Sequence, residues 1–266
     1  MSTTERSRTS GRQYVSKRNP ALPAVFALVL GTAIALIGLA MMTIGSSPTV
    51  KGASFIWLPA ALQLVAGVWL GPFLGFLAGG LGAYAAGILA YGGWGIVDII
   101  MNPIAGGFAN AVLPWILFKA LRIDPGIGVV DKQDLRRNIP KAILLTVVVL
   151  LAGLANIWLG LPSPWGLVLP LVVLVIGATL LLRGIKAGSR DLLLALLVAV
   201  ICCVVSALIG AIGATVGGKP FSAALLDPGI GWFVGDTISA FLGVYLLMVF
   251  TPRVREAIGI YGESNE

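Results

Sequence analysis

Long apolar runs separated by short clusters of Gly, Pro and charged residues dominate the chain after its first 20 residues. A transmembrane helix needs about 20 predominantly apolar residues, and eight runs approach that length. The second and third runs meet at Gly71-Pro72 with almost no loop between them. We therefore predict an all-α, polytopic transmembrane helix bundle of about eight spans, within a range of six to eight. The predicted spans are 22–45, 54–70, 72–91, 103–121, 141–160, 166–183, 191–216 and 230–250.

The distribution of basic residues gives these spans an orientation. With eight spans and the N-terminus inside, 16 of the 18 Lys and Arg residues fall in inner segments. Only Lys51 and Lys219 fall in outer loops. Cytoplasmic loops of membrane proteins carry such an excess of Lys and Arg. We therefore predict that the N- and C-termini are both cytoplasmic.

The spans are predicted to form one transmembrane helical domain, 21–252, with short polar tails. Residues 1–20 are rich in Ser, Thr and Arg, which predicts a disordered basic cytoplasmic tail. The first apolar run is too long for the core of a cleavable signal peptide. We predict one sizeable cytoplasmic loop at 122–140 and a short cytoplasmic tail at 253–266.

Composition supports the membrane class and narrows the chemistry. The chain is 58% hydrophobic and 11% charged, with a mean hydropathy of +0.99, whereas soluble domains are about 25% charged. The net charge of +7 follows from topology, so no nucleic-acid partner is expected. There is no His, and the two cysteines, Cys202 and Cys203, are adjacent within an apolar run. These facts exclude His-ligated metals, thiolate clusters, His-dependent nucleophilic catalysis and a disulfide framework.

The sequence also contains no GxxxxGK[ST] phosphate-binding loop and no soluble catalytic domain. We therefore expect a protein that is not an enzyme and that needs no metal and no cofactor. No Lys or Arg lies in the interior of a predicted span, since Lys119, Lys141 and Arg183 stand at span ends, and no predicted span contains a pair of carboxylates. A proton or sodium relay would have few groups to use, which disfavours a self-powered secondary transporter.

Small residues at four-residue spacing form stripes on three predicted helices. In lipid, such stripes let helix backbones approach closely and gain van der Waals contact. Packing within the chain is the simpler interpretation, and contact with another protein is the alternative for the first span. The stripes comprise Ala27, Gly31 and Ala35, then Gly71, Gly75, Gly79, Ala83 and Gly87, and finally Gly231, Gly235, Ser239 and Gly243.

Polar residues within the apolar spans bear most directly on function. A central Asp costs roughly 2.5 to 3.5 kcal/mol on insertion scales and persists only if it is paired, hydrated or used. The predicted topology places most of these residues in the outer half of the membrane. They either bond neighbouring helices or converge on a pocket that opens to the outside. The candidates are Gln63, Asp98, Asn102, Asn110, Asn156 and Asp236.

Four tryptophans fall at the predicted outer boundary: Trp57, Trp94, Trp165 and Trp232. An aromatic belt at the headgroup level explains such positions in any membrane protein. The alternative is that some of these rings, those of Trp57 and Trp232 among them, line the same outer pocket. Bonding between helices is favoured for Asn156, and Asp98 can simply be solvated in a loop.

The segment 57–82, Trp-Leu-Pro-Ala-Ala-Leu-Gln-Leu-Val-Ala-Gly-Val-Trp-Leu-Gly-Pro-Phe-Leu-Gly-Phe-Leu-Ala-Gly-Gly-Leu-Gly, resembles the substrate-binding S components of energy-coupling factor (ECF) transporters. Those proteins show an apolar helix, a Gly-Pro break and a Gly-rich helix of this kind. The segment 102–119 and Gly235-Asp236 match further parts of the pattern, so the resemblance covers about half of the chain. Familiar S components have six spans, so 141–183 would be an additional hairpin.

This resemblance implies a multi-pass subunit of a prokaryotic plasma membrane that captures a vitamin-like solute from outside. ATP hydrolysis would come from two ATPase subunits, connected through a transmembrane coupling protein. In that family a small-xxx-small motif on the first span docks the coupling protein, and the matching residues here are Ala27, Gly31 and Ala35.

On this hypothesis the aromatic side chains stack on a planar ring of the solute, and the amides and carboxylates orient it. Asp236 favours a ligand with a hydrogen-bond donor or a positive charge. The predicted substrate-binding residues are Trp57, Gln63, Asp98, Asn102, Asn110, Trp232 and Asp236.

A second resemblance is to the membrane-associated sensor domain of bacterial histidine kinases and cyclic-di-nucleotide enzymes. Those domains have eight spans, and the matching positions are 57–59, Asn110, Trp232, Gly235-Asp236 and Pro252. A cytoplasmic effector follows such a domain, whereas 14 residues follow Pro252 here. A stand-alone sensor would therefore need a partner chain.

Overall fold

The computed structural model describes residues 21–44, 56–91, 100–128 and 189–262, together with isolated helical positions between 140 and 180. Over these residues the chain is helical, with connecting turns and no strand, which confirms the predicted all-α class. Five of the described helices are long and apolar enough to cross a membrane. They are Ala21–Thr43, Pro59–Ala90, which folds back at Gly71 as described below, Ile104–Leu121, Asp191–Val216 and Ile230–Ala257.

Several predicted segments lie wholly or largely outside the described residues. They include the tail 1–20 and the spans 141–160 and 166–183, so the count of about eight spans stays a prediction. The loop predicted at 122–140 is described only over its first seven residues, 122–128.

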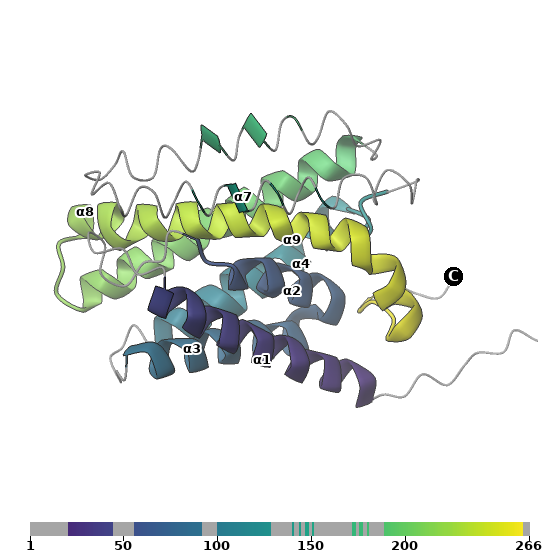
Figure 1. Ribbon diagram of the computed structural model, residues 1–266, viewed down its shortest axis with the longest axis horizontal. Helices are drawn as coiled ribbons and strands as arrows, with labels where there is room; N and C mark the ends of the chain where they lie inside the picture. The colour runs from purple at the N-terminus through teal and green to yellow at the C-terminus, as the bar shows by residue number, and fades with distance from the viewer. Residues whose placement is uncertain are drawn as a thin grey trace, which may run out of the picture.

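The helices lie roughly side by side along the molecule. In Figure 1, α1 and α9 run along its long axis, and the short α8 lies at the end opposite the C-terminus. The α-helices are α1 Ala21–Ile44, α2 Pro59–Phe76, α3 Gly82–Tyr91, α4 Leu113–Leu121, α7 Ser189–Val216, α8 Phe221–Ala224 and α9 Ile230–Ala257. Wider π-helical turns form η1 Leu77–Leu81, η3 Ile104–Val112 and η4 Leu225–Gly229.

The chain reverses direction within α2, at Gly71. This residue has φ +79° and ψ −172°, a conformation that glycine adopts easily and L-residues rarely do. A Cβ on Gly75 would lie 2.7 Å from the Cα of Gly67, and Gln63 Nε2 lies 3.4 Å from the Gly79 carbonyl oxygen. Both pairs are symmetric about Gly71, so the two arms are antiparallel helices. The predicted break at Gly71-Pro72 is therefore present, and we call this unit the α2 hairpin.

Glycines bring η3 close to both arms of the α2 hairpin. A Cβ on Gly79, in the second arm, would lie 2.6 Å from the Gly106 carbonyl oxygen. A Cβ on Gly67, in the first arm, would overlap the carbonyl group of Ala111. The predicted small-residue stripe thus serves packing within the chain at Gly75 and Gly79, where three backbones meet.

The first arm of the hairpin runs parallel to α9. A Cβ on Gly243 would lie 2.9 Å from the Ala61 carbonyl oxygen, and eight residues further along both helices Trp69 Nε1 donates to Thr251 Oγ1 at 2.9 Å. Helices α7 and α9 are antiparallel, because Ser206 contacts Asp236 and Gly210 contacts Trp232.

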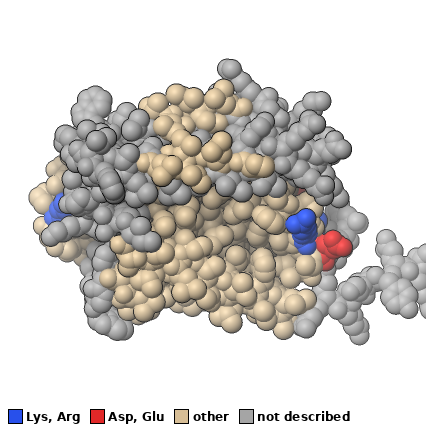
Figure 2. Space-filling view, viewed as in Figure 1, with Lys and Arg blue, Asp and Glu red and all other residues tan. Residues whose placement is uncertain are grey.

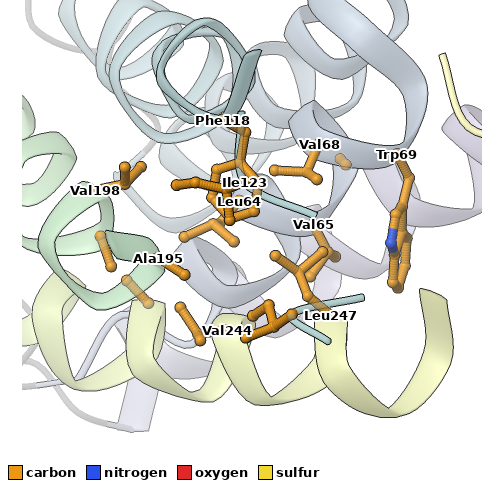
Figure 3. Close-up of a cluster of buried hydrophobic side chains, with 14 of the residues drawn as sticks. Leu64, Val65, Val68, Trp69, Phe118, Ile123, Ala195, Val198, Val244 and Leu247 are labelled. Carbon is orange, nitrogen blue, oxygen red and sulfur yellow. The ribbon is translucent and has the colours of Figure 1, made fainter. Parts of the chain in front are cut away.

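A hydrophobic core fills the space between these helices. Figure 3 shows its side chains directed toward one another from α2, α4, α7 and α9. Its labelled members include Leu64, Val65 and Val68 from α2, Phe118 from α4, Ala195 and Val198 from α7, and Val244 and Leu247 from α9. Trp69 also belongs to this core, and its ring nitrogen bonds Thr251.

On the face shown in Figure 2, the described charged residues lie at the two ends of the bundle, with uncharged surface between them. One end holds the hairpin turn and most of the described basic residues, and we call it the basic end. There Arg255 forms an ion pair with Asp124 at 3.0 Å, and the Asp124 backbone N–H donates to Asp191 Oδ2 at 3.2 Å. The segments that end at residue 128 and begin at residue 189 therefore adjoin at this end.

Helix α9 extends beyond the span predicted for it. It continues to Ala257 rather than ending at residue 250, although Pro252 lies within it. Proline removes one helical hydrogen bond, but the turn that follows is held by the buried Val254 and by the ion pair of Arg255. The predicted tail 253–266 is thus partly helical, because contacts between helices override the local signal from proline.

Candidate functional site

Four polar side chains from four helical segments meet inside the bundle, and we call them the polar cluster. They are Gln63 of α2, Asn110 of η3, Ser206 of α7 and Asp236 of α9. Their exposed fractions are 0%, 4%, 1% and 3%, so all four are buried. Such groups need hydrogen-bond partners, because an unpaired polar group in an apolar interior is costly.

Two of the three hydrogen bonds within the polar cluster end on one carboxylate oxygen. Asn110 Nδ2 donates to Asp236 Oδ2 at 3.1 Å and to Gln63 Oε1 at 3.1 Å. Ser206 Oγ donates to the same Asp236 oxygen at 2.6 Å. Both of these donors to Asp236 are neutral, so they solvate its charge without balancing it.

The local backbone of η3 makes room for the cluster. A Cβ on Gly106 would lie 2.7 Å from Gln63 Nε2, so the Gln63 amide occupies the space that a side chain would take. Asn110 follows one turn later in the same π-helical segment. Wide π-helical turns are uncommon and often mark functional sites, because they redirect one side chain out of the regular register.

Three of the predicted site residues therefore lie together: Gln63, Asn110 and Asp236. Asn102 is partly buried and lies two turns before Asn110, at the start of the segment that leads into η3. Asp98 lies outside the described residues.

The two predicted tryptophans lie beside the polar cluster rather than in it. The ring of Trp232 packs on Gly210 of α7, one helical turn from the contact between Ser206 and Asp236 and toward the end opposite the basic end. The backbone N–H of Trp57 donates to the Gly235 carbonyl oxygen at 3.2 Å, while its ring points to Gly38 of α1. Trp232 is thus the tryptophan whose ring lies nearer the cluster.

The predicted docking stripe of the first span contacts the chain's own helices. Ala27 is buried, and Ala35 is partly buried. A Cβ on Gly31 would lie 3.4 Å from the Cα of Ala78, and a Cβ on Gly82 would lie 2.8 Å from the Gly31 carbonyl oxygen. This face of α1 therefore packs on η1 and α3, as the simpler interpretation of the stripe expects.

Sequence reasoning missed Ser206. A lone serine within an apolar helix is a weak signal, because its hydroxyl group often bonds the backbone of its own helix. The informative pattern was its spacing, since Cys202, Ser206 and Gly210 place small residues four positions apart in a run of Leu and Val. Such a stripe marks the face that approaches a neighbouring helix.

The polar cluster offers one carboxylate, two amides and one hydroxyl group. This set can bind and orient a solute that carries hydrogen-bond donors or a positive charge. Among the residues that the structure describes, no group of three or more His, Cys, Asp or Glu side chains is placed to hold a metal ion. Comparison of the chain with protein-family models, with curated proteins and with solved structures gives no match.

Proposed function

We propose that this protein is the membrane-embedded solute-capture subunit of an ECF-type importer in a prokaryotic plasma membrane. The observation that carries the proposal is the polar cluster, in which Gln63, Asn110 and Asp236 meet inside a bundle of apolar helices. In this proposal the basic end is cytoplasmic, because Lys and Arg are enriched on that side of membranes.

The energetics of Asp236 support a functional role. Placing an Asp in the middle of a membrane span costs roughly 2.5 to 3.5 kcal/mol on insertion scales. A hydrogen bond between transmembrane helices returns about 0.6 kcal/mol on average. At that average, the two bonds that Asp236 accepts, from Asn110 and Ser206, return about 1.2 kcal/mol, less than the cost of an Asp at the centre of a span. This difference supports a role for the carboxylate in binding a solute.

The chemistry of the cluster defines the class of solute. A single carboxylate with neutral partners favours a ligand that is cationic or that offers a strong hydrogen-bond donor. Such a ligand replaces the donors Asn110 and Ser206 at Asp236, and the two freed side chains can then bond other polar atoms of the ligand. The ring of Trp232, one turn away, supplies an aromatic surface on the approach from the opposite end.

In the proposed cycle, the solute enters from the outer end and is held at the polar cluster. A coupling protein and two ATPase subunits supply the energy, because this chain has no nucleotide-binding loop. Transport then requires a state of the bundle with different affinity for the solute, toward which the partners shift the population.

Purification of the tagged protein from native membranes in mild detergent tests the proposal. Mass spectrometry of the purified material is expected to identify two ATPases and a larger membrane protein as stoichiometric partners. A histidine kinase or a nucleotide cyclase in their place would overturn the importer assignment and establish the sensor alternative.

A further inference from the structure

Beyond α9 the chain turns back across the basic end of the bundle. The Ile258 N–H donates to the Val254 carbonyl oxygen at 2.9 Å, and the Gly259 N–H donates to that of Arg255 at 3.2 Å. Gly259 has φ +75°, the left-handed conformation with which glycine commonly ends a helix. Residues 258–262, which we call the strap, therefore leave the axis of α9 and run toward the hairpin turn.

The strap binds the turn of the α2 hairpin. The Tyr261 N–H donates to the Trp69 carbonyl oxygen at 3.0 Å. That carbonyl group lies in the last turn before Gly71, where a helix leaves acceptors without a partner of its own. The Tyr261 ring lies on Gly71 so closely that a Cβ at this position would overlap it.

The strap also binds α4. The rings of Tyr261 and Trp115 meet edge to face, with centroids 5.9 Å apart and an interplanar angle of 62°. Lys119 Nζ donates to the Gly262 carbonyl oxygen at 2.7 Å. The strap thus connects α9, the hairpin turn and α4 at one point of the basic end.

The attachment of the strap is shallow. Tyr261 is 55% exposed, and only Gly259 and Ile260 of the strap are buried. Nε1 of Trp115 is buried and has no acceptor among the described groups. Separation of Tyr261 from Trp115 would admit water to such a donor, whereas the helices beneath would keep their own contacts. The contacts of the strap can therefore open without unfolding of the bundle.

We propose that the strap is a latch: it holds the α2 hairpin at the basic end, and it must detach before the hairpin can move. Gln63 lies eight residues before the turn, about 12 Å along the first arm at 1.5 Å per residue, so motion of this arm alters the polar cluster. The regulatory meaning of the latch rests on the proposed function, because it couples the basic end to the solute site. The claim that the strap holds the α2 hairpin in place does not depend on the proposed function.

Hydrogen exchange of the full-length protein in detergent, without added solute, tests the latch. In the Tyr261→Ala variant, amide exchange is expected to rise at least tenfold both at the hairpin turn and in the first arm around Gln63. Tyr261→Phe keeps the ring and the backbone bond, so it is expected to exchange like the unmodified protein. Phe221→Ala is the matched control, since Phe221 is an exposed aromatic residue on α8, far from the strap in sequence and at the other end of the bundle.

Unchanged exchange at the hairpin turn in Tyr261→Ala would overturn the latch. An increase confined to the strap itself would do the same, because the strap would then be a passive tail. Lys119→Met, which removes only the bond to Gly262, is a second and milder variant, with the same direction of change expected. These outcomes are independent of the partners that co-purify, so failure of the latch and failure of the importer assignment are distinguishable.

Discussion

A single carboxylate oxygen, Asp236 Oδ2, accepts hydrogen bonds from both Asn110 and Ser206. These two donors differ in what they contribute. Asn110 also bonds Gln63 and so connects the carboxylate to the hairpin, whereas Ser206 only caps the carboxylate from α7. Replacing Ser206 by alanine therefore measures how much one hydrogen bond to the buried carboxylate contributes to stability.

We predict that Ser206→Ala lowers the free energy of unfolding by about 0.6 kcal/mol, the average measured for hydrogen bonds between transmembrane helices, and by no more than about 1.7 kcal/mol, the largest value measured. Unfolding titration with denaturing detergent in mixed micelles measures this loss. Cys202→Ala, one turn earlier on α7 and also buried, is the control for removing a small side chain. A loss in Ser206→Ala above about 3 kcal/mol would mean that the cluster mainly holds the bundle together.

Sequence reasoning found three of the four cluster residues because intramembrane amides and carboxylates are rare and costly. It could not distinguish Asn110 from Asn102, which lie eight residues apart, two steps of four, on one face of a regular helix. The π-helical turn of η3 changes that register, and η3 lies in close contact with Gly67 and Gly79 of the hairpin. Which amide reaches Asp236 was therefore fixed by tertiary contact.

At the scale of elements, the α2 hairpin is the unit that places Gln63. It requires a tight reversal at Gly71 and close approach of its second arm to η3. Glycines meet both requirements, Gly71 at the reversal and Gly79 at the contact with η3. A substitution to alanine, which adds a methyl group, can therefore test each of them.

We predict that Gly79→Ala destabilises the protein by about 1 to 3 kcal/mol, the usual cost of overpacking. Its Cβ would lie 2.6 Å from the Gly106 carbonyl oxygen, which is backbone and cannot rotate away. Thermal unfolding in detergent measures the effect. Gly217→Ala, at the exposed end of α7 with its nearest neighbour at 3.3 Å, is the control. Equal melting temperatures for the two variants would show that the helices separate easily at Gly79.

The hairpin break and the small-residue stripes could be read from the sequence, because Gly-Pro and four-residue spacing are local signals. The end of α9 could not be predicted from the sequence. Pro252 indicates a helix end locally, but the contacts of Val254 and Arg255 with the rest of the bundle continue the helix to Ala257.

At the scale of the whole molecule, the distribution of charge divides the bundle into two ends. The basic end carries the ion pair of Arg255, the hairpin turn and the strap, whereas Lys219 follows α7 at the opposite end. The positive-inside rule then predicts which end faces the cytoplasm.

We predict that a membrane-impermeant maleimide labels Ser222→Cys in intact cells and labels Ala257→Cys only after the cells are broken. Both positions are exposed, and they lie at opposite ends of α9 and the segment before it. The native Cys202 and Cys203 are buried and are replaced by Ala in both variants. The reverse labelling pattern would invert the topology and place the basic end outside.

The measurement that tests solute capture most directly is the amount of small molecule that remains bound after purification from native membranes. Extracts of the unmodified protein, Asp236→Asn and Glu256→Gln are compared by mass spectrometry. Glu256 is an exposed carboxylate of α9 outside the cluster, so its variant is the matched control. We expect one compound with a donor or positive charge, retained equally by the unmodified protein and Glu256→Gln, and reduced at least tenfold in Asp236→Asn. Equal retention in Asp236→Asn would contradict the assignment of the polar cluster as the solute site.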